Sequence, residues 1–125
     1  MRRWVIGGLS ALALVGCGGG SPPARTAPGD PSTINIAAPA TLDTTGRADF
    51  IAGRTVAAES GCLACHTIGV QGNPGPGADL THAGSRLTTP QLLKALRSPP
   101  APMPSYALLA PSLLTNLVTF LHDLQ

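Results

Sequence analysis

The stretch Cys62-Leu63-Ala64-Cys65-His66 carries the most information in this chain of 125 residues. Its two thiols lie three positions apart, which is nearly one turn of a helix, so both can face the same ligand. The imidazole of His66 follows directly. A CxxC pair alone is ambiguous, because thioredoxin-like redox sites, zinc sites and disulfides all use that spacing. The histidine that follows it narrows the choice.

The spacing CxxCH is typical of covalent attachment of one haem. We expect Cys62 and Cys65 to form thioethers at one edge of the porphyrin and His66 to bind the iron as its proximal ligand. The rest of the chain is poor in large apolar side chains, since Phe50, Tyr106 and Phe120 are the only aromatics after the first seventeen residues. A covalently held haem would supply the apolar surface that so small a domain needs.

The amino-terminal residues explain the third cysteine. Two arginines, Arg2 and Arg3, precede an apolar stretch that ends in Leu14-Val15-Gly16-Cys17. This arrangement resembles a bacterial lipoprotein signal, which implies a signal peptide over residues 1–16 and lipidation of Cys17. The alternative is an uncleaved membrane anchor. The apolar run is shorter than the roughly 18–20 residues that a membrane-spanning helix needs.

The charge of the chain and its expected compartment agree with a lipoprotein signal at the amino terminus. The precursor has eight basic and six acidic residues, and removal of Arg2 and Arg3 leaves six of each. A nearly neutral mature chain gives no reason to expect nucleic acid as a partner. We expect the protein to be lipid-anchored at a bacterial membrane and to face the periplasm or the cell exterior, where haem attachment to CxxCH also takes place. The choice between inner and outer membrane stays open.

Composition divides the mature chain into two parts. Residues 17–47 are rich in Gly, Pro, Ser and Thr and lack hydrophobic periodicity, which predicts a flexible linker. Residues 48–125 have the patterns of a single small domain. No alternation of apolar and polar residues there indicates a strand.

Three helices are expected in that domain. The first spans residues 47–60, with Asp49 in its first turn, where the helix dipole favours an anion. The second spans 89–97 and has a proline at its first helical position and basic residues in its last turn. The third spans 111–124. Its apolar residues fall at helical spacing on one face, and they are Leu113, Leu117, Phe120, Leu121 and Leu124.

The order of helix, CxxCH, long loop, helix, methionine-bearing loop and terminal helix resembles that of class I cytochromes c over residues 48–125. The resemblance implies an all-α fold with three to four helices packed around one covalently bound haem. Gly53 resembles the glycine that lets the first and last helices of that family cross closely, and Phe120-Leu121 resembles the pair that meets it. Ala57 and Ala58 stand where the family often has an aromatic, which implies a less tightly packed crossing.

The loop over residues 73–86 resembles the family's Gly-Pro-x-Leu segment followed by Gly-x-Arg. The resemblance implies that a backbone carbonyl, of Pro76 or of Ala78, accepts the Nδ1 proton of His66. It also implies that Arg86 contacts a haem propionate, the alternative being an ordinary surface arginine. The sequence Asp-Leu-Thr-His-x-Gly-Ser-Arg, at residues 79–86, is similar to that of the cytochrome c domains fused to subunit II of some haem-copper oxidases.

Met103 is the only methionine apart from Met1. Its setting, Pro102-Met103-Pro104, resembles the family's Met-Pro loop, which implies that Met103 is the sixth ligand of the iron. A loop hydrophobe is the alternative role for this side chain. His82 and His122 are the rivals for a second axial histidine, but His122 is expected in solvent and His82 on the proximal side.

These expectations describe a membrane-anchored monohaem cytochrome c that carries single electrons between a redox protein donor and acceptor, which are respiratory or dehydrogenase partners. The alternative is a cytochrome c subunit of a terminal oxidase or dehydrogenase complex. A third possibility is a thiol-disulfide oxidoreductase using Cys62 and Cys65, although the βαβ setting of that class is missing. We find no acid–base pair and no Ser-His-Asp set, so an electron carrier is expected rather than an enzyme.

Overall fold

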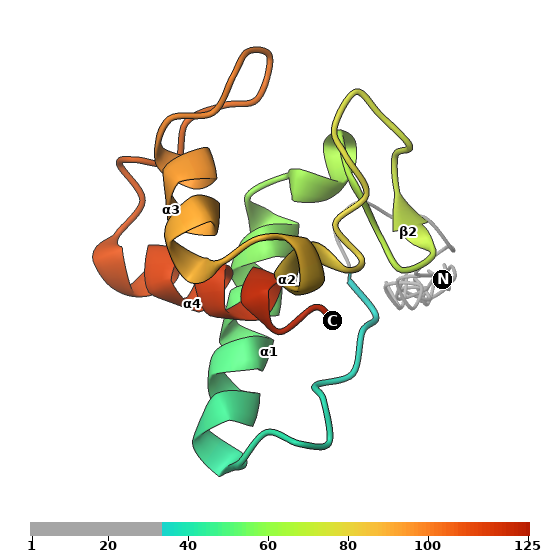
Figure 1. Cartoon of the computed structure of the whole chain (residues 1–125), viewed down its shortest axis with the longest axis vertical. Coiled ribbons are helices and arrows are strands. Elements are labelled where there is room, and N and C mark those ends of the chain that lie inside the picture. Colours follow the sequence, from blue (N-terminus) through green and yellow to red (C-terminus); the bar gives the residue numbers. More distant parts are fainter. Residues whose placement is uncertain (1–33) are drawn as a thin grey trace, which may run out of the picture.

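The computed structural model describes residues 34–125 (Figure 1). That part of the chain is mostly helical, in agreement with the coarse fold class expected from the sequence. Its α-helices are α1 (Thr44–Glu59), α2 (Ala83–Arg86), α3 (Thr89–Arg97) and α4 (Pro111–His122). A short 3₁₀ helix, η1 (Cys62–Ala64), follows α1. None of the helices in residues 34–125 has the length and apolar character that crossing a membrane requires.

A small hairpin was not expected from the sequence. Strands β1 (Thr67–Ile68) and β2 (Gln71–Gly72) pair antiparallel, with Thr67 opposite Gly72 and Ile68 opposite Gln71. Two residues per strand are too few for an alternating pattern to show in the sequence. The hairpin directly follows His66 and begins the long loop that leads to α2.

Helix α1 begins earlier than expected because Asp43 caps it. The Asp43 Oδ1 atom accepts a hydrogen bond from the backbone N–H of Gly46 at 2.7 Å. A side-chain oxygen at this position satisfies one of the backbone donors that the first turn leaves unpaired. Asp49 was predicted in the first turn of this helix. Because the helix begins at Thr44, Asp49 instead lies beyond that turn.

Residues 34–43 pack against the domain, although the sequence predicted a linker up to residue 47. Ile34 is 4% exposed. The backbone N–H of Asn35 donates to Oε1 of Gln71 at 2.6 Å, and Arg54 of α1 donates to the carbonyl of Ile36 at 2.6 Å. The packed part of the chain thus begins no later than Ile34. The predicted signal peptide over residues 1–16, Cys17 and the linker before residue 34 lie outside the described residues.

Helices α3 and α4 match their predicted positions closely. Helix α3 has the expected bounds, with its N-cap at Thr88, whose backbone N–H donates to the Gln91 side chain at 2.9 Å. Helix α4 ends two residues before the predicted end, at His122. Its buried face includes Leu114, which is 3% exposed, whereas the predicted core residue Leu113 is 41% exposed. The helix is thus rotated slightly from the orientation that the apolar spacing indicated.

The core centres on the crossing of α1 and α4, which pack against each other in Figure 1. A Cβ atom added to Gly53 would lie 2.0 Å from the carbonyl oxygen of Asn116 and 2.6 Å from Cβ of Phe120. The rings of Phe50 and Phe120 meet edge to face with their centroids 5.0 Å apart. The expected close crossing at Gly53 is therefore present, and Phe50 provides an aromatic contact in it.

Candidate functional site

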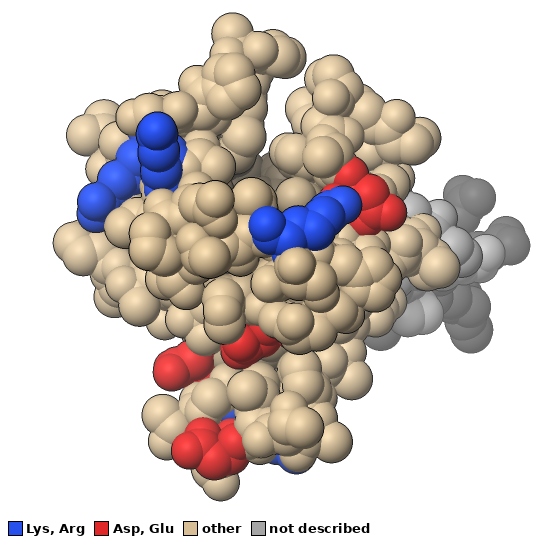
Figure 2. All heavy atoms as spheres, in the orientation of Figure 1, with Lys and Arg blue, Asp and Glu red and all other residues tan. Residues whose placement is uncertain are grey.

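Two loops project to the same side of the helices, residues 73–82 after the hairpin and residues 98–110 after α3 (Figure 1). A cavity of about 490 Å³ lies between them. Figure 2 shows the corresponding notch in the molecular surface. The lining is mostly apolar and includes Leu80, Leu87, Leu92, Leu96, Pro104 and Leu121. Among the described residues, no Asp, Glu, Lys or Arg lines this cavity.

The CxxCH residues form one end of the cavity. Helix α1 stops at Glu59, and the chain then winds into η1, where the backbone N–H groups of Cys65 and His66 both donate to the carbonyl of Cys62, at 3.3 and 3.0 Å. This tight turn brings Cys62, Cys65 and His66 to the cavity wall together. The three residues that the sequence singled out are therefore neighbours around one space.

The two cysteines differ in their surroundings. Both are free thiols; Cys62 is buried and Cys65 is half-buried. Burial raises the pKa of the Cys62 thiol, and a hydrogen bond with Tyr106 lowers it by less.

Residues 34–125 hold no group of three or more His, Cys, Asp and Glu side chains placed to bind a metal ion.

His66 is held by a backbone carbonyl. Its Nδ1 atom lies 2.6 Å from the carbonyl oxygen of Ala78. A carbonyl oxygen can only accept, so the proton of a neutral His66 must be on Nδ1. The lone pair of Nε2 is then available to a metal. Of the two acceptors that the resemblance implied, Pro76 and Ala78, the structure has Ala78.

The loop that carries Ala78 is tied to the CxxCH segment on both sides of that residue. Gly77 donates its backbone N–H to the carbonyl of Cys65 at 2.7 Å, and Leu80 donates to the carbonyl of Thr67 at 2.8 Å. A Cβ atom on Gly77 would lie 2.4 Å from Nδ1 of His66. Only glycine lets the loop come so close to the imidazole ring. No sequence pattern indicated this role of Gly77, because the role depends on a contact that spacing alone does not reveal.

Met103 lines the same cavity from the other loop. It is half-buried, and its backbone N–H donates to the carbonyl of Pro100 at 3.2 Å. The structure thus places around one space the two predicted thioether residues and the two predicted iron ligands: Cys62, Cys65, His66 and Met103.

Arg86 is not part of the cavity lining. Its guanidinium donates to the backbone carbonyl of Asp79, and its side chain lines a separate surface hollow of about 370 Å³. The carboxylate of Asp79 accepts hydrogen bonds from Thr81, which lower the pKa of Asp79. The expected contact of Arg86 with a haem propionate stays a prediction, and the bond that Arg86 makes to the carbonyl of Asp79 holds the 73–82 loop.

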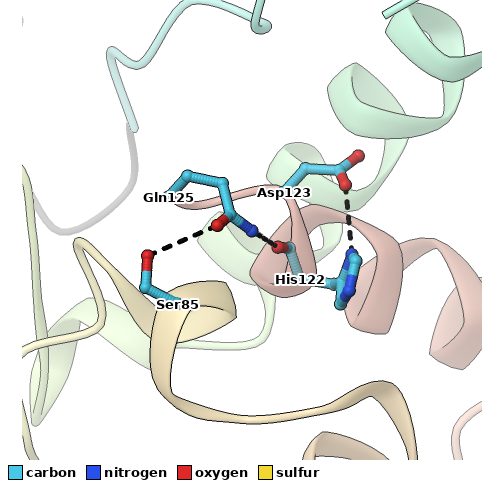
Figure 3. A network of polar contacts seen from close by, with 4 residues as sticks. All are labelled: Ser85, His122, Asp123 and Gln125. Atoms are coloured by element: carbon cyan, nitrogen blue, oxygen red, sulfur yellow. Dashed lines mark hydrogen bonds and ion pairs between the residues drawn. The ribbon is translucent and has the colours of Figure 1, made fainter.

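The two rival histidines also lie outside the cavity lining. His82 is exposed at the N-cap of α2. His122 ends α4, where its Nδ1 lies 3.3 Å from Oδ1 of Asp123 (Figure 3). The same figure shows Gln125 donating to the carbonyl of His122 and accepting from the hydroxyl of Ser85. These contacts join the end of α4 to α2 on the outside of the fold.

Tyr106 is a second cavity residue that the sequence analysis did not assign to the site. It is half-buried, and its hydroxyl donates to the carbonyl of Ser60 at 3.0 Å. Burial, with smaller contributions from the two cysteines, raises the pKa of Tyr106 to about 12. Its phenol therefore stays protonated, and able to donate, throughout the physiological pH range. The sequence of this proline-rich loop gave no sign that its aromatic residue, Tyr106, would reach the CxxCH segment.

Basic side chains gather over α3 in Figure 2, where Lys94 and Arg97 are exposed in the last turn of the helix. They lie on the helix that supports one wall of the cavity but do not line it. Within residues 34–125, the acidic and basic side chains thus lie outside the cavity lining.

Comparison of this chain with protein-family models, with curated proteins and with solved structures gave no match.

Proposed function

We propose that this cavity binds one haem covalently and that the protein is a monohaem cytochrome c that carries single electrons. The observation that carries the proposal is the convergence of Cys62, Cys65, His66 and Met103 on one apolar cavity, although Met103 comes from a different loop. Two thiols, an imidazole and a thioether around a largely hydrophobic space form the donor set of covalent haem with His and Met ligands.

The residues present fit such a group in three respects. The volume of about 490 Å³ falls in the range of cofactor-sized pockets. The hydrogen bond from Nδ1 of His66 to Ala78 leaves Nε2 as the metal-binding nitrogen. The close crossing of α1 and α4 at Gly53 supports the finer fold assignment, a class I cytochrome c fold, which we propose together with the function.

A bound haem would supply the one-electron chemistry. The residues of the chain would hold the haem and tune its chemistry. Cys62 and Cys65 would hold the group, and His66, made more basic by its hydrogen bond to Ala78, would be one ligand of its iron. Met103 would be the other, and its neutral sulfur favours the ferrous state. The apolar wall excludes water and charged groups from the site, which keeps the local dielectric low.

A reductive titration of the protein, purified from native membranes, tests the function. We expect each chain to take up one electron reversibly, and we expect Met103→Ala to lower the midpoint potential because the neutral sulfur ligand is lost. Covalent haem should be retained in this variant. Uptake of two electrons per chain by a Cys62–Cys65 disulfide, which gives the two thiols, with no haem spectrum, would instead establish a thiol-disulfide oxidoreductase. Partners that copurify would identify a subunit of a larger complex.

We further propose that the carrier is attached to a bacterial membrane through lipid on Cys17, on its periplasmic or exterior face. The support is the Leu14-Val15-Gly16-Cys17 sequence. Two or three acyl chains give stable anchoring, since each buried methylene contributes about 0.8 kcal/mol. Cys17→Ser should release the protein from membranes or stall its processing. An intact mass that retains Met1, or an unmodified Cys17, would exclude the anchor.

A further inference from the structure

Tyr106 and Met103 lie in the same loop, residues 98–110, and both line the cavity. The backbone N–H of Tyr106 donates to the carbonyl of Leu96 at 2.8 Å, so the base of the loop is attached to α3. The hydroxyl of Ser105 adds a second attachment to α3 through the carbonyl of Arg97 at 2.7 Å. Neither bond crosses the cavity.

The phenol of Tyr106 instead connects the loop to the end of α1. Its hydroxyl donates to the carbonyl of Ser60, forty-six residues earlier in the chain, at 3.0 Å. Ser60 is the C-cap of α1 and is itself held there, since its N–H donates to the carbonyl of Val56 at 2.8 Å. One side chain of the 98–110 loop is thus attached to the carboxyl end of α1, directly before the CxxCH segment.

We infer that Tyr106 is a positioning residue for Met103: its bond to Ser60 ties the 98–110 loop to the end of α1 and thereby keeps the Met103 sulfur in the cavity that His66 also lines. The inference rests on the proposed function, because it concerns the strength of Met103 ligation. It adds to that function a residue that touches neither iron nor substrate. Loss of the hydroxyl alone should weaken the sulfur ligand while leaving the attachment of haem intact.

The test is displacement of Met103 from the ferric protein by imidazole, followed in the absorption spectrum. Tyr106→Phe removes one hydroxyl and keeps the ring. A hydrogen bond of ordinary net strength corresponds to an increase of about three- to tenfold in the apparent affinity for imidazole. Cyanide should give the same factor, because both probes report release of Met103. Thr115→Val, which removes a hydroxyl bonded within α4, is the control and should leave both affinities unchanged.

A double-mutant cycle separates positioning from stability. In a Met103→Ala background, Tyr106→Phe should no longer change the affinity for imidazole, since the sulfur that it positions is absent. Equal imidazole affinities of the wild type and Tyr106→Phe would overturn the inference, even if the variant unfolded more easily. So would a factor that persists in the Met103→Ala background. Absence of covalent haem from the wild type would instead refute the proposed function.

Discussion

The α1–α4 crossing and the cavity between the loops are built by different means. At the crossing, the backbone of Gly53 lies directly against α4, and the rings of Phe50 and Phe120 are fully buried. At the cavity, the loops are held by a few hydrogen bonds, those of Gly77 and Leu80 on one side and those of Ser105 and Tyr106 on the other. The comparison indicates that stability resides in the crossing and that the properties of the bound group are set by a few bonds in the loops.

The largest effect should come from breaking the crossing. Phe120→Ala removes a fully buried ring that contacts Phe50 and should lower the free energy of unfolding by about 3–5 kcal/mol, because it leaves a cavity in the core. Urea denaturation of the holoprotein measures it. Leu113→Ala on the exposed side of the same helix should cost much less. Comparable losses for the two variants would contradict the assigned orientation of α4.

A substitution in the loop should alter the site more than the fold. In Gly77→Ala the new methyl group would push against the His66 ring and disrupt its hydrogen bond to Ala78. His66 would become less basic, so the ferric state would lose stabilisation and the midpoint potential should rise by about 20–60 mV, the equivalent of one hydrogen bond. Redox titration provides the measurement. Ala78→Gly keeps the carbonyl and is the control. An unchanged potential in Gly77→Ala would show that His66 does not depend on this contact.

The smallest effect is expected at Asp79, which is exposed and next to Ala78. Hydrogen bonds from Thr81 hold the pKa of the Asp79 carboxyl below its ordinary value of about 4. The ionised group therefore contributes stability at neutral pH, and this contribution is lost as the pH falls through the lowered pKa. Asp79→Asn should reduce the urea midpoint slightly at pH 7, and the difference from wild type should vanish in acid. A difference that does not change with pH would assign the effect to another cause.

Local patterns predicted the three longer helices, and they singled out Cys62, Cys65, His66 and Met103, which the structure brings to one cavity. Pro90 and the residues around it define the start of α3, and CxxCH places three site residues within five positions, so no long-range information was needed. Gly77 and Tyr106 were missed because each acts through a contact with a distant segment, His66 in one case and Ser60 in the other. The burial of Leu114 rather than Leu113 likewise depends on how α4 meets α1, which the apolar spacing of a single helix leaves undetermined.

Extraction with acidified acetone tests the central claim, that Cys62 and Cys65 hold haem covalently in this cavity. The full chain is produced in a bacterium that attaches haem to exported CxxCH proteins, and the precipitate and solvent are then compared for colour. We expect the haem to stay with the precipitated protein, and the intact mass to exceed that of the processed, lipidated chain by one haem. A double variant, Cys62→Ala with Cys65→Ala, should release any haem it binds. Haem from the wild type that passes into the solvent would contradict the account.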